Sequence, residues 1–432
     1  MRVLWFTSSI MPDHAIALGI TSSPRAAWLP ALAQAFVESK KIVLAVATNI
    51  PDEIYKKHNI NGVEYYSLSS CKINNTNDCI SSALINNYQN VLEDFKPDII
   101  HIHGTEYFQG LLTGRGYIKS PTVLSIQGVL TAYQNQYWGG LSFYQLLISR
   151  TLRDWIRLDG IFEQKVEMTR RAEIEQEIFA SNSAFIGRTL WDRSLTRKLN
   201  PNARYYHCNE LIRKPFYDVQ WNICNICRHT IFASSASYPL KGFHVLIKAV
   251  SLLRNEFPNI QIRTPLANFY SGMKGAKRFW QDCRSGGYAR YLTDLICNEG
   301  LEDNIFALPM LEAEDMVQEL VKAHVFVLPS FIENSPNSLA EAMLIGTPSI
   351  ASFVGGVPSM TSNEETALLF SPGDETLLAE QIRLIFLDDQ LAIGLSYNAQ
   401  KFSKNRYCKE IIVNDMLNIY NTEIQNQAIE KF

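Results

Sequence analysis

Residues 325–360 constrain the fold more than any other stretch of this 432-residue chain. The apolar run Val325–Leu328 is typical of a parallel strand that is covered on both faces. A helix is expected from Pro336 to about Ile345, with Ser335 as its N-cap, because proline suits the first helical position. A second strand follows at residues 349–351. Because parallel neighbours need a crossover connection, the stretch predicts a right-handed strand–loop–helix–strand unit.

The start of this predicted helix carries groups that suit a phosphorylated ligand. Its first backbone N–H groups lack partners and carry the positive end of the helix dipole, which favours phosphate. Glu333 precedes the helix and Glu341 lies inside it, four residues after Asn337 and on the same face. A solvated acid is the alternative for Glu341 alone, whereas the whole set favours a site for a sugar nucleotide. Its other members are Asn334, Ser335, Asn337, Ser338 and Leu339.

The spacing Glu333-x7-Glu341, followed by EAM, a Gly-x-Pro turn and a Gly-Gly loop, resembles the donor-site signature of retaining glycosyltransferases of family four. The resemblance implies the GT-B fold, an α/β architecture of two Rossmann-like, doubly wound domains that face a cleft. It also implies a nucleotide-diphosphate sugar, such as a UDP-sugar, as the donor. The expected reaction is transfer of the sugar to a hydroxyl with retention, without a metal or other cofactor, in cell-surface polysaccharide or glycoconjugate synthesis.

The roles of single residues follow from the same resemblance. Glu333 is expected to hold the donor sugar and to favour positive charge on its ring. Glu341 is expected to hold the ribose. Lys241, which follows a predicted strand at residues 231–233, is expected to neutralise phosphate charge. With Glu333, Lys241 makes up the predicted catalytic pair.

One departure from the family pattern concerns the phosphate site. Members of the family generally carry an arginine five residues before the lysine, where this chain has Ala236. Three alternatives follow: Lys241 alone suffices, another base such as Lys274 or Arg278 substitutes, or turnover is weak.

Four positions in the first half of the chain are predicted to contact substrate. Gly19 lies in the loop that in relatives faces the donor phosphates, although a plain turn glycine is an equal alternative. His101 and His103 end a strand at the ligand edge; we expect them on opposite faces, with His103 toward the cleft and His101 a hydrogen-bonded structural residue. Gln127 stands where relatives carry a sugar-binding histidine. Glu210 lines the cleft or forms an interdomain ion pair.

Domain boundaries follow from the alternation of strands and helices in both halves. Residues 1–217 are the expected acceptor domain and residues 218–228 the linker. Residues 229–386 are the expected nucleotide-sugar domain, and the resemblance implies that the helical tail 387–432 packs back on the first domain.

Composition excludes several classes of protein. A net charge of −3 argues against a nucleic-acid partner. No apolar run approaches the roughly 20 residues of a membrane span, and the N-terminus is not a convincing secretory signal. The eight cysteines form no disulfide framework, so a reducing cytoplasm is expected. The pair Cys224 and Cys227 lacks a second pair at zinc spacing.

The expected partners are a nucleotide sugar and a glycan or lipid-linked acceptor. Residues 141–158 are amphipathic, with three arginines and Trp155. Such a face suits anionic headgroups and peripheral contact with the inner membrane face, although an ordinary surface helix is the commoner explanation. Residues 163–177 predict another exposed helix.

Two alternatives to glycosyl transfer remain at this point. A nucleotide-sugar hydrolase or epimerase on the same fold would need no acceptor. A catalytically degenerate module that binds a nucleotide sugar or scaffolds a glycan complex is favoured by the losses at Ala236 and Gln127.

Overall fold

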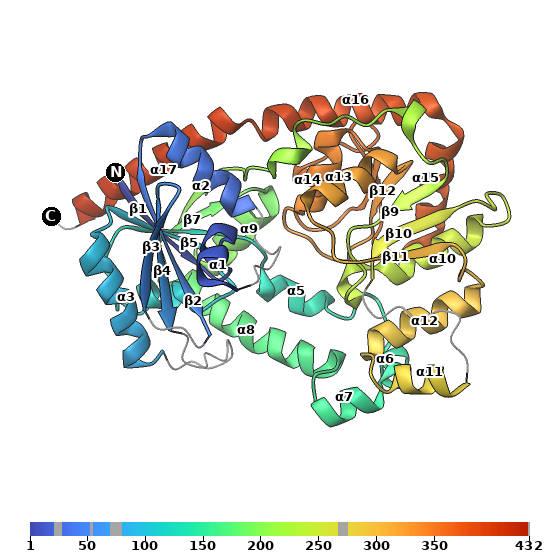
Figure 1. The fold of residues 1–432 in the computed structure, drawn as a ribbon, viewed down its shortest axis with the longest axis horizontal. Helices are drawn as coiled ribbons and strands as arrows, with labels where there is room; N and C mark the ends of the chain where they lie inside the picture. The colour runs from blue at the N-terminus through green and yellow to red at the C-terminus, as the bar shows by residue number, and fades with distance from the viewer. Residues whose placement is uncertain (21–27, 52–54, 70–79, 267–274, 431–432) are drawn as a thin grey trace. The chain divides into compact units, whose positions relative to one another are not determined.

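The chain folds into two compact units in a computed structural model (Figure 1). The structure describes residues 1–20, 28–51, 55–69, 80–266 and 275–430. The first unit is built from Met1–Thr131, Met168–Arg213 and Tyr407–Phe432. The second unit is built from Ala132–Glu167 and Lys214–Arg406.

The first unit contains an eight-stranded sheet in the order β3-β4-β2-β1-β5-β6-β7-β8, parallel except where β3 pairs antiparallel with β4. Its central strands are almost wholly buried, as expected for a sheet covered on both faces. The strands are β1 (Arg2–Thr7), β2 (Val43–Ile50), β3 (Lys56–Ile60), β4 (Val63–Ser69), β5 (Ile99–His103), β6 (Thr122–Ser125), β7 (Ala184–Gly187) and β8 (Arg204–His207).

Helices accompany this sheet. They are α1 (Pro12–Leu18), α2 (Trp28–Ser39), α3 (Ser82–Phe95), α4 (Gln109–Gly114) and α9 (Leu190–Leu199). Two more, α5 (Leu130–Gln136) and α8 (Ile161–Ser181), run from one unit into the other. Ser23 and Pro24, which predict the cap and first position of a helix after the first strand, lie outside the described residues.

The C-terminal helix α17 (Lys409–Glu430) belongs to the first unit, where it packs against α2, β5 and β6. Tyr420 is fully buried beside Phe36, and its hydroxyl accepts a hydrogen bond from Trp5 Nε1 at 3.3 Å. The preceding helix α16 (Asp389–Arg406) belongs to the second unit. Of the expected helical tail, only α17 therefore lies in the first unit.

The second unit contains a fully parallel six-stranded sheet in the order β11-β10-β9-β12-β13-β14. The strands are β9 (Thr230–Phe232), β10 (Gln261–Pro265), β11 (Ile305–Leu308), β12 (Val325–Leu328), β13 (Ser349–Ser352) and β14 (Leu368–Phe370). The helices are α6 (Phe143–Ser149), α7 (Leu152–Arg157), α10 (Phe243–Leu253), α11 (Gly275–Asp282), α12 (Gly287–Glu299), α13 (Ala313–Lys322), α14 (Asn337–Ile345), α15 (Glu375–Leu387) and α16.

The segment Ala132–Glu167 packs in the second unit, although it was expected in the first domain. A side chain on Gly139 would come within 2.1 Å of the Pro239 carbonyl oxygen, so the two backbones are in contact. Further along, Thr151 Oγ1 donates to the Ser285 carbonyl at 2.8 Å. These contacts join residues more than 90 positions apart in sequence, which is why strand and helix order did not reveal them.

None of the described helices is both long and apolar enough to cross a bilayer.

Candidate functional site

The order of strands reverses between β9 and β12 in the second sheet. From β9 the chain builds outward through β10 and β11, and from β12 it builds the other way through β13 and β14. Ligands of open α/β sheets bind at the carboxyl ends of the strands at such a reversal. The loops that follow β9 and β12 carry Lys241 and Glu333, the two predicted catalytic residues.

Lys241 and Glu333 form an ion pair, with 2.6 Å between Nζ and Oε1. The same carboxylate oxygen accepts a hydrogen bond from Ser330 Oγ at 2.7 Å. The side chains are 22% and 8% exposed, respectively. Burial alone would lower the pKa of Lys241, but attraction to Glu333 outweighs it and raises that pKa, so the lysine stays charged.

Close backbone contact between the two loops fixes this pair. Gly242 ends the short 3₁₀ turn that carries Lys241 and has φ +68°. A Cβ atom at Gly242 would lie 1.9 Å from the Pro329 carbonyl oxygen, so no other residue fits there. Phe331 N also donates to the Leu240 carbonyl oxygen at 2.8 Å.

The Gly-Gly loop holds Glu333 from the other side. Gly355 has φ +49°, and a Cβ atom there would lie 2.0 Å from the Glu333 carbonyl oxygen. The same oxygen accepts a hydrogen bond from Gly356 N at 3.0 Å. The signature glycines therefore position the backbone of the first acid.

The helix α14 begins at Asn337, one residue later than predicted. Pro336 is the N-cap, with ψ 116°, because its backbone is extended rather than helical, and Ser335 is therefore not the cap. No side chain in the described part of the chain caps this end through a hydrogen bond. The Leu339 amide donates to the Pro336 carbonyl at 3.2 Å, so this amide already has a backbone partner.

The predicted polar residues around α14 differ in burial. Ser335, Asn337 and Ser338 are half-buried. Asn334 is buried, and its backbone N–H donates to the Tyr133 hydroxyl at 3.0 Å. Glu341 is only 4% exposed, so it is not a solvated surface acid.

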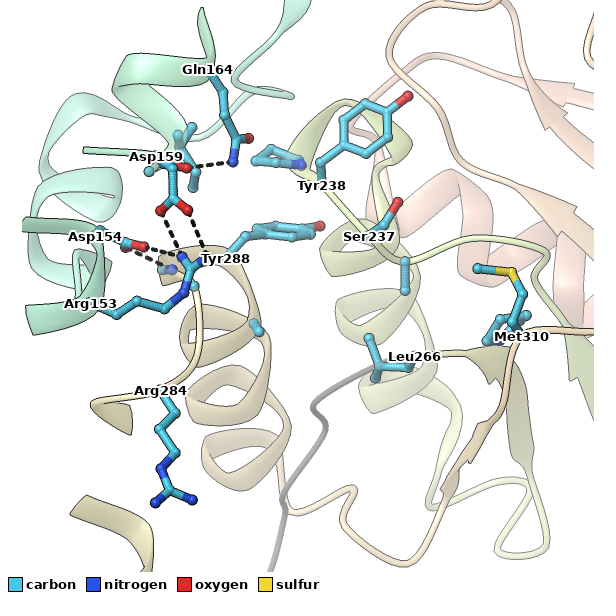
Figure 2. A pocket seen from close by; sticks show the side chains of 18 of the residues that line it. Arg153, Asp154, Asp159, Gln164, Ser237, Tyr238, Leu266, Arg284, Tyr288 and Met310 are labelled. Atoms are coloured by element: carbon cyan, nitrogen blue, oxygen red, sulfur yellow. Dashed lines mark hydrogen bonds and ion pairs between the residues drawn. The ribbon is translucent and has the colours of Figure 1, made fainter. Parts of the chain in front are cut away.

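A cavity of about 400 Å³ opens at the carboxyl ends of β9, β10 and β11 (Figure 2). Tyr238, from the loop that also carries Lys241, lines it together with Tyr288. Figure 2 shows Leu266 and Met310 on one wall. The opposite wall comes from residues 153–164, where Arg153 is joined to Asp159 by two hydrogen bonds of 2.8 Å. The cavity thus combines an apolar wall with aromatic and charged groups.

Ala236 also lines this cavity, where it contributes a buried methyl group rather than the arginine of the family pattern. Of the two substitutes considered, Lys274 lies outside the described residues, and so does the side chain of Arg278.

In the first sheet the strand order reverses between β1 and β5, and His103 ends β5 at that point. The prediction of opposite faces for the two histidines is wrong: their rings lie 3.8 Å apart on one face, because residues two apart in a strand point the same way. His101 bonds to the Tyr420 hydroxyl and to Ser125 Oγ at 2.7 and 2.6 Å, as a structural histidine does.

His103 is different from its neighbour. It is 7% exposed, and neither ring nitrogen has a hydrogen-bond partner among the described residues. Burial, and to a lesser extent the nearby His101, lowers the pKa of His103 well below its ordinary value. The ring is therefore neutral and can donate one hydrogen bond and accept another.

Gln127 and Glu210 contact each other in the first unit, with Gln127 Nε2 donating to Glu210 Oε1 at 2.5 Å. The other oxygen of Glu210 pairs with Arg188, which lies directly after β7. Arg188 was not singled out from the sequence, in which no strand was predicted at residues 184–187; only the pairing of β6 with β7 brings it beside Gln127 and Glu210. Burial raises the pKa of Glu210, while attraction to Arg188 opposes that shift.

Two further buried acids were missed. Glu106 Oε1 accepts a hydrogen bond from Gly128 N at 2.6 Å, which ties the loop after β5 to the loop that carries Gln127. Glu175 accepts hydrogen bonds from Thr131 N and Oγ1 at 2.8 and 2.7 Å. It lies on α8, whose charged residues predicted an exposed helix, yet it is fully buried. Burial raises the pKa of Glu175 to about 7.

Gly19 ends α1 in a left-handed conformation with φ +68°, and nothing lies within 4 Å of where a Cβ atom would be. In the structure it is a helix-terminating glycine, the plainer of the two alternatives.

The structure thus brings Lys241, Glu333 and the start of α14 together in the second unit, and Gln127 and Glu210 together in the first. Among the described residues, no three histidine, cysteine, aspartate or glutamate side chains come together as metal ligands would.

Comparison with known proteins adds three findings. Residues 228–402 match the family model described as Glycosyl transferases group 1. A curated relative, the D-inositol 3-phosphate glycosyltransferase of Corynebacterium efficiens, is 27% identical over 167 residues, which are 39% of this chain and 37% of the relative. The chain therefore matches less than half of that relative's length.

Two solved structures share the fold over nearly the whole chain. Sucrose-phosphate synthase from Thermosynechococcus elongatus gives a TM-score of 0.67 at 16% identity, covering 98% of both chains. Anabaena HepE, solved in complex with UDP-glucose, gives 0.65 at 14% identity, covering 98% of this chain and all of that one. The predicted GT-B architecture of two Rossmann-like α/β units is confirmed.

Proposed function

We propose that this chain, whose residues 228–402 match the Glycosyl transferases group 1 model, transfers a sugar from a nucleotide diphosphate to a hydroxyl acceptor. The observation that carries the proposal is the Lys241–Glu333 pair, held by glycine contacts at the strand-order reversal beside the uncapped start of α14. It supplies positive and negative groups a few ångströms apart, which suits a substrate with both a diphosphate and a sugar.

Each charged group has a task in this reaction. When the bond from the anomeric carbon to the diphosphate breaks, negative charge develops on the diphosphate. Lys241 and the backbone amides at the start of α14 would stabilise that charge in a site shielded from water. Glu333 would accept hydrogen bonds from the donor sugar and favour positive charge on its ring, while Glu341 would hold the ribose.

We propose that the new bond forms on the face that the leaving group departs from. The acceptor oxygen then bonds to the anomeric carbon with retention, and its proton is released with the nucleoside diphosphate. Because Lys241 and the helix amides offset the phosphate charge, no metal ion is needed. Turnover that persists in excess chelator would agree with this, and turnover restored only by a divalent cation would contradict it.

The cavity beside Lys241 suits the base of the donor nucleotide. Tyr238 and Tyr288 offer aromatic surface, and Leu266 and Met310 offer apolar surface, at one end of the proposed diphosphate site. UDP-glucose, which HepE binds, is the first donor to test. The proposed acceptor is a glycan or a lipid-linked sugar in cell-surface polysaccharide or glycoconjugate synthesis.

The test is a thermal-shift comparison of UDP-glucose with other nucleotide sugars, followed by calorimetric titration of Glu341→Ala. A ligand at 100 times its Kd stabilises the folded state by about 2.7 kcal/mol, which a melting curve detects readily. We expect Glu341→Ala to weaken donor binding by about tenfold or more, because it removes a charge-assisted contact with the ribose. Near-normal affinity in that variant, or no shift with any nucleotide sugar, would count against the proposal.

A second candidate is a module that binds the nucleotide sugar without turning it over. Two observations favour it: Ala236 offers only a methyl group at the expected arginine position, and Gln127 is engaged with Glu210. Donor binding without product across an acceptor panel would select this candidate. Release of free sugar or an epimer without an acceptor would instead indicate a hydrolase or an epimerase.

A further inference from the structure

Helix α6 turns its apolar side to solvent. Phe143, Tyr144, Leu147 and Ile148 are 59, 70, 42 and 53% exposed, and their spacing places them on one face of the helix. The buried residues of this helix are Leu146 and Ser149, whose hydroxyl donates to the Gln145 carbonyl. An ordinary surface helix buries its apolar stripe, whereas α6 leaves most of its apolar side chains exposed.

Helix α7 also exposes its apolar side chains. Leu152, Trp155 and Ile156 are 58, 56 and 73% exposed, and Leu158 just after the helix is 64% exposed. Among the charged residues between them, the side chains of Asp154 and Arg153 are 2% and 25% exposed, whereas Arg157 is exposed. The exposed apolar side chains of both helices make up what we call the α6–α7 face: Phe143, Tyr144, Leu147, Ile148, Leu152, Trp155, Ile156 and Leu158.

Buried polar contacts hold the α6–α7 face on the second unit. Asp154 Oδ2 accepts a hydrogen bond from Gly287 N at 2.9 Å, at the first residue of α12. Thr151 caps α7 and also donates to the Ser285 carbonyl at 2.8 Å. Helix α6 packs directly against α12. Because its polar groups are used to anchor it, the segment presents its apolar side chains as part of a fixed surface and not as a loose loop.

One cation of this segment is left for an anionic surface. Residues 143–158 contain three arginines and one aspartate, but Arg150 pairs with Glu163 and Arg153 pairs with Asp159. Arg157 is exposed and has no ion-pair partner among the described residues. Arg150 lies 3.8 Å over the ring of Trp155. Exposed aliphatic, tryptophan and tyrosine side chains with arginine beside them match the boundary between acyl chains and anionic headgroups.

We propose that the α6–α7 face binds the surface of an anionic lipid bilayer, with its apolar side chains inserted among the acyl chains near the headgroups. A protein partner is less well matched, because exposed aliphatic and aromatic side chains with an arginine beside them are the pattern of a headgroup boundary. The proposal does not depend on glycosyl transfer. It places Arg153 and Asp154, which line the cavity in Figure 2, on the same short helix as the membrane-inserted Trp155.

The test is sedimentation of the full chain with vesicles of equal parts phosphatidylcholine and phosphatidylglycerol. We expect the wild type to bind, and the triple variant Ile148→Gln, Leu152→Gln, Ile156→Gln to bind weaker by on the order of a hundredfold, because three inserted aliphatic side chains are lost. Arg157→Gln should weaken binding by about fivefold and reduce its salt dependence. Binding to pure phosphatidylcholine should be much weaker.

The matched control is the triple variant Leu252→Gln, Leu384→Gln, Leu387→Gln. These leucines are 53, 45 and 66% exposed on α10 and α15 of the same unit, so they match the tested residues in chemistry and exposure. We expect this variant to bind vesicles as the wild type does. Melting temperatures of both triple variants should stay near that of the wild type, because the replaced side chains are exposed.

Depth of insertion is read from fluorescence. Lipids brominated on the acyl chain should quench part of the tryptophan emission of the wild type, and that part should disappear in Trp155→Phe. Failure of the wild type to bind anionic vesicles, or equal binding by the two triple variants, would overturn the proposal. A wild-type dimer that the Ile148, Leu152, Ile156 variant converts to monomer would overturn it too, and would assign the face to a second copy of this chain.

Discussion

Lys241→Met removes the ammonium group that neutralises Glu333. In the wild type, Nζ and Oε1 are 2.6 Å apart, and the glutamate side chain is only 8% exposed. At an effective dielectric constant of about 20, two unit charges at this separation attract by about 6 kcal/mol. Desolvation of the two ions costs several kcal/mol each, so the net contribution of the intact pair is small. What matters is the carboxylate that remains.

The variant leaves this carboxylate buried with Ser330 as its remaining described partner. Loss of one member of a buried pair costs about 3–5 kcal/mol, and we expect about 3 because the lysine side chain is 22% exposed, so water can reach the site. Glu333→Gln should cost about 1.5 kcal/mol, since the flexible lysine can turn toward solvent. The double variant should lose only about 2 kcal/mol, because no unpaired charge remains.

Urea unfolding of the wild type, the two single variants and the double variant measures these free energies, with a spectroscopic probe that reports unfolding of the second unit. Arg383→Met serves as the control, because Arg383 pairs with Glu256 on the exposed surface and its loss should have a much smaller effect. Additive losses in the double variant would refute the reasoning. They would mean that the two groups do not depend on each other despite their contact.

Three further variants test other parts of the structure. Gly355→Ala would put a Cβ atom 2.0 Å from the Glu333 carbonyl oxygen at φ +49°, and we expect it to cost about 2 kcal/mol of unfolding free energy and to weaken donor binding in titration. Arg188→Met leaves Glu210 buried and should cost about 3 kcal/mol at neutral pH, less in acid where the carboxyl is protonated, as unfolding at several pH values would show. Glu175→Gln should remove a pH dependence of the unfolding free energy. Because burial raises the pKa of Glu175 to about 7 in the folded state, the wild type should lose on the order of 3 kcal/mol of stability between about pH 4.5 and 7. Unfolding free energies measured across this range would show the loss as a slope against pH.

The controls for these variants come from the same chain. Gly116 has φ +73°, but the space around its Cβ position is open. Gly116→Ala should therefore cost about 1 kcal/mol of unfolding free energy and leave donor binding unchanged. An equal effect of the two glycine variants would contradict the close-contact argument. For Glu175, the sign follows from proton binding: between the two pKa values the folded state holds a proton that the unfolded state lacks, so stability falls as pH rises. A wild type and Glu175→Gln with the same slope would contradict it.

The second sheet and its site could be predicted largely from the sequence because the relevant signals are local. The apolar run at Val325–Leu328, the glycine at 346 and the loop acid Glu333 are close in sequence, and each acts through backbone preference or burial of its own neighbours. The exact start of α14 could not be read in this way. The capping rules favour Ser335 as the N-cap and Pro336 as the first helical residue, and only the backbone angles of Pro336 show that the helix begins one residue later.

The first unit was harder to predict. The prediction that His101 and His103 lie on opposite faces overlooked the two-residue period of a strand, and in the structure both rings lie on the same face. Glu175 was assigned to an exposed helix because its neighbours are charged, whereas burial of one position depends on what packs over it. Arg188 becomes informative only when the strands at 122–125 and 184–187 pair and bring it beside Gln127 and Glu210.

The sequence by itself determined the two doubly wound halves, the loop acid and lysine at strand ends, and the glycines that let backbones approach, because these features depend on short-range sterics and apolar periodicity. Only the tertiary structure decided that Ala132–Glu167 packs in the second unit, that α6 and α7 expose their apolar sides, and that Lys241 meets Glu333. These outcomes depend on contacts between residues far apart in the chain, and such contacts are set by the free energy of the whole packed unit rather than by any local preference.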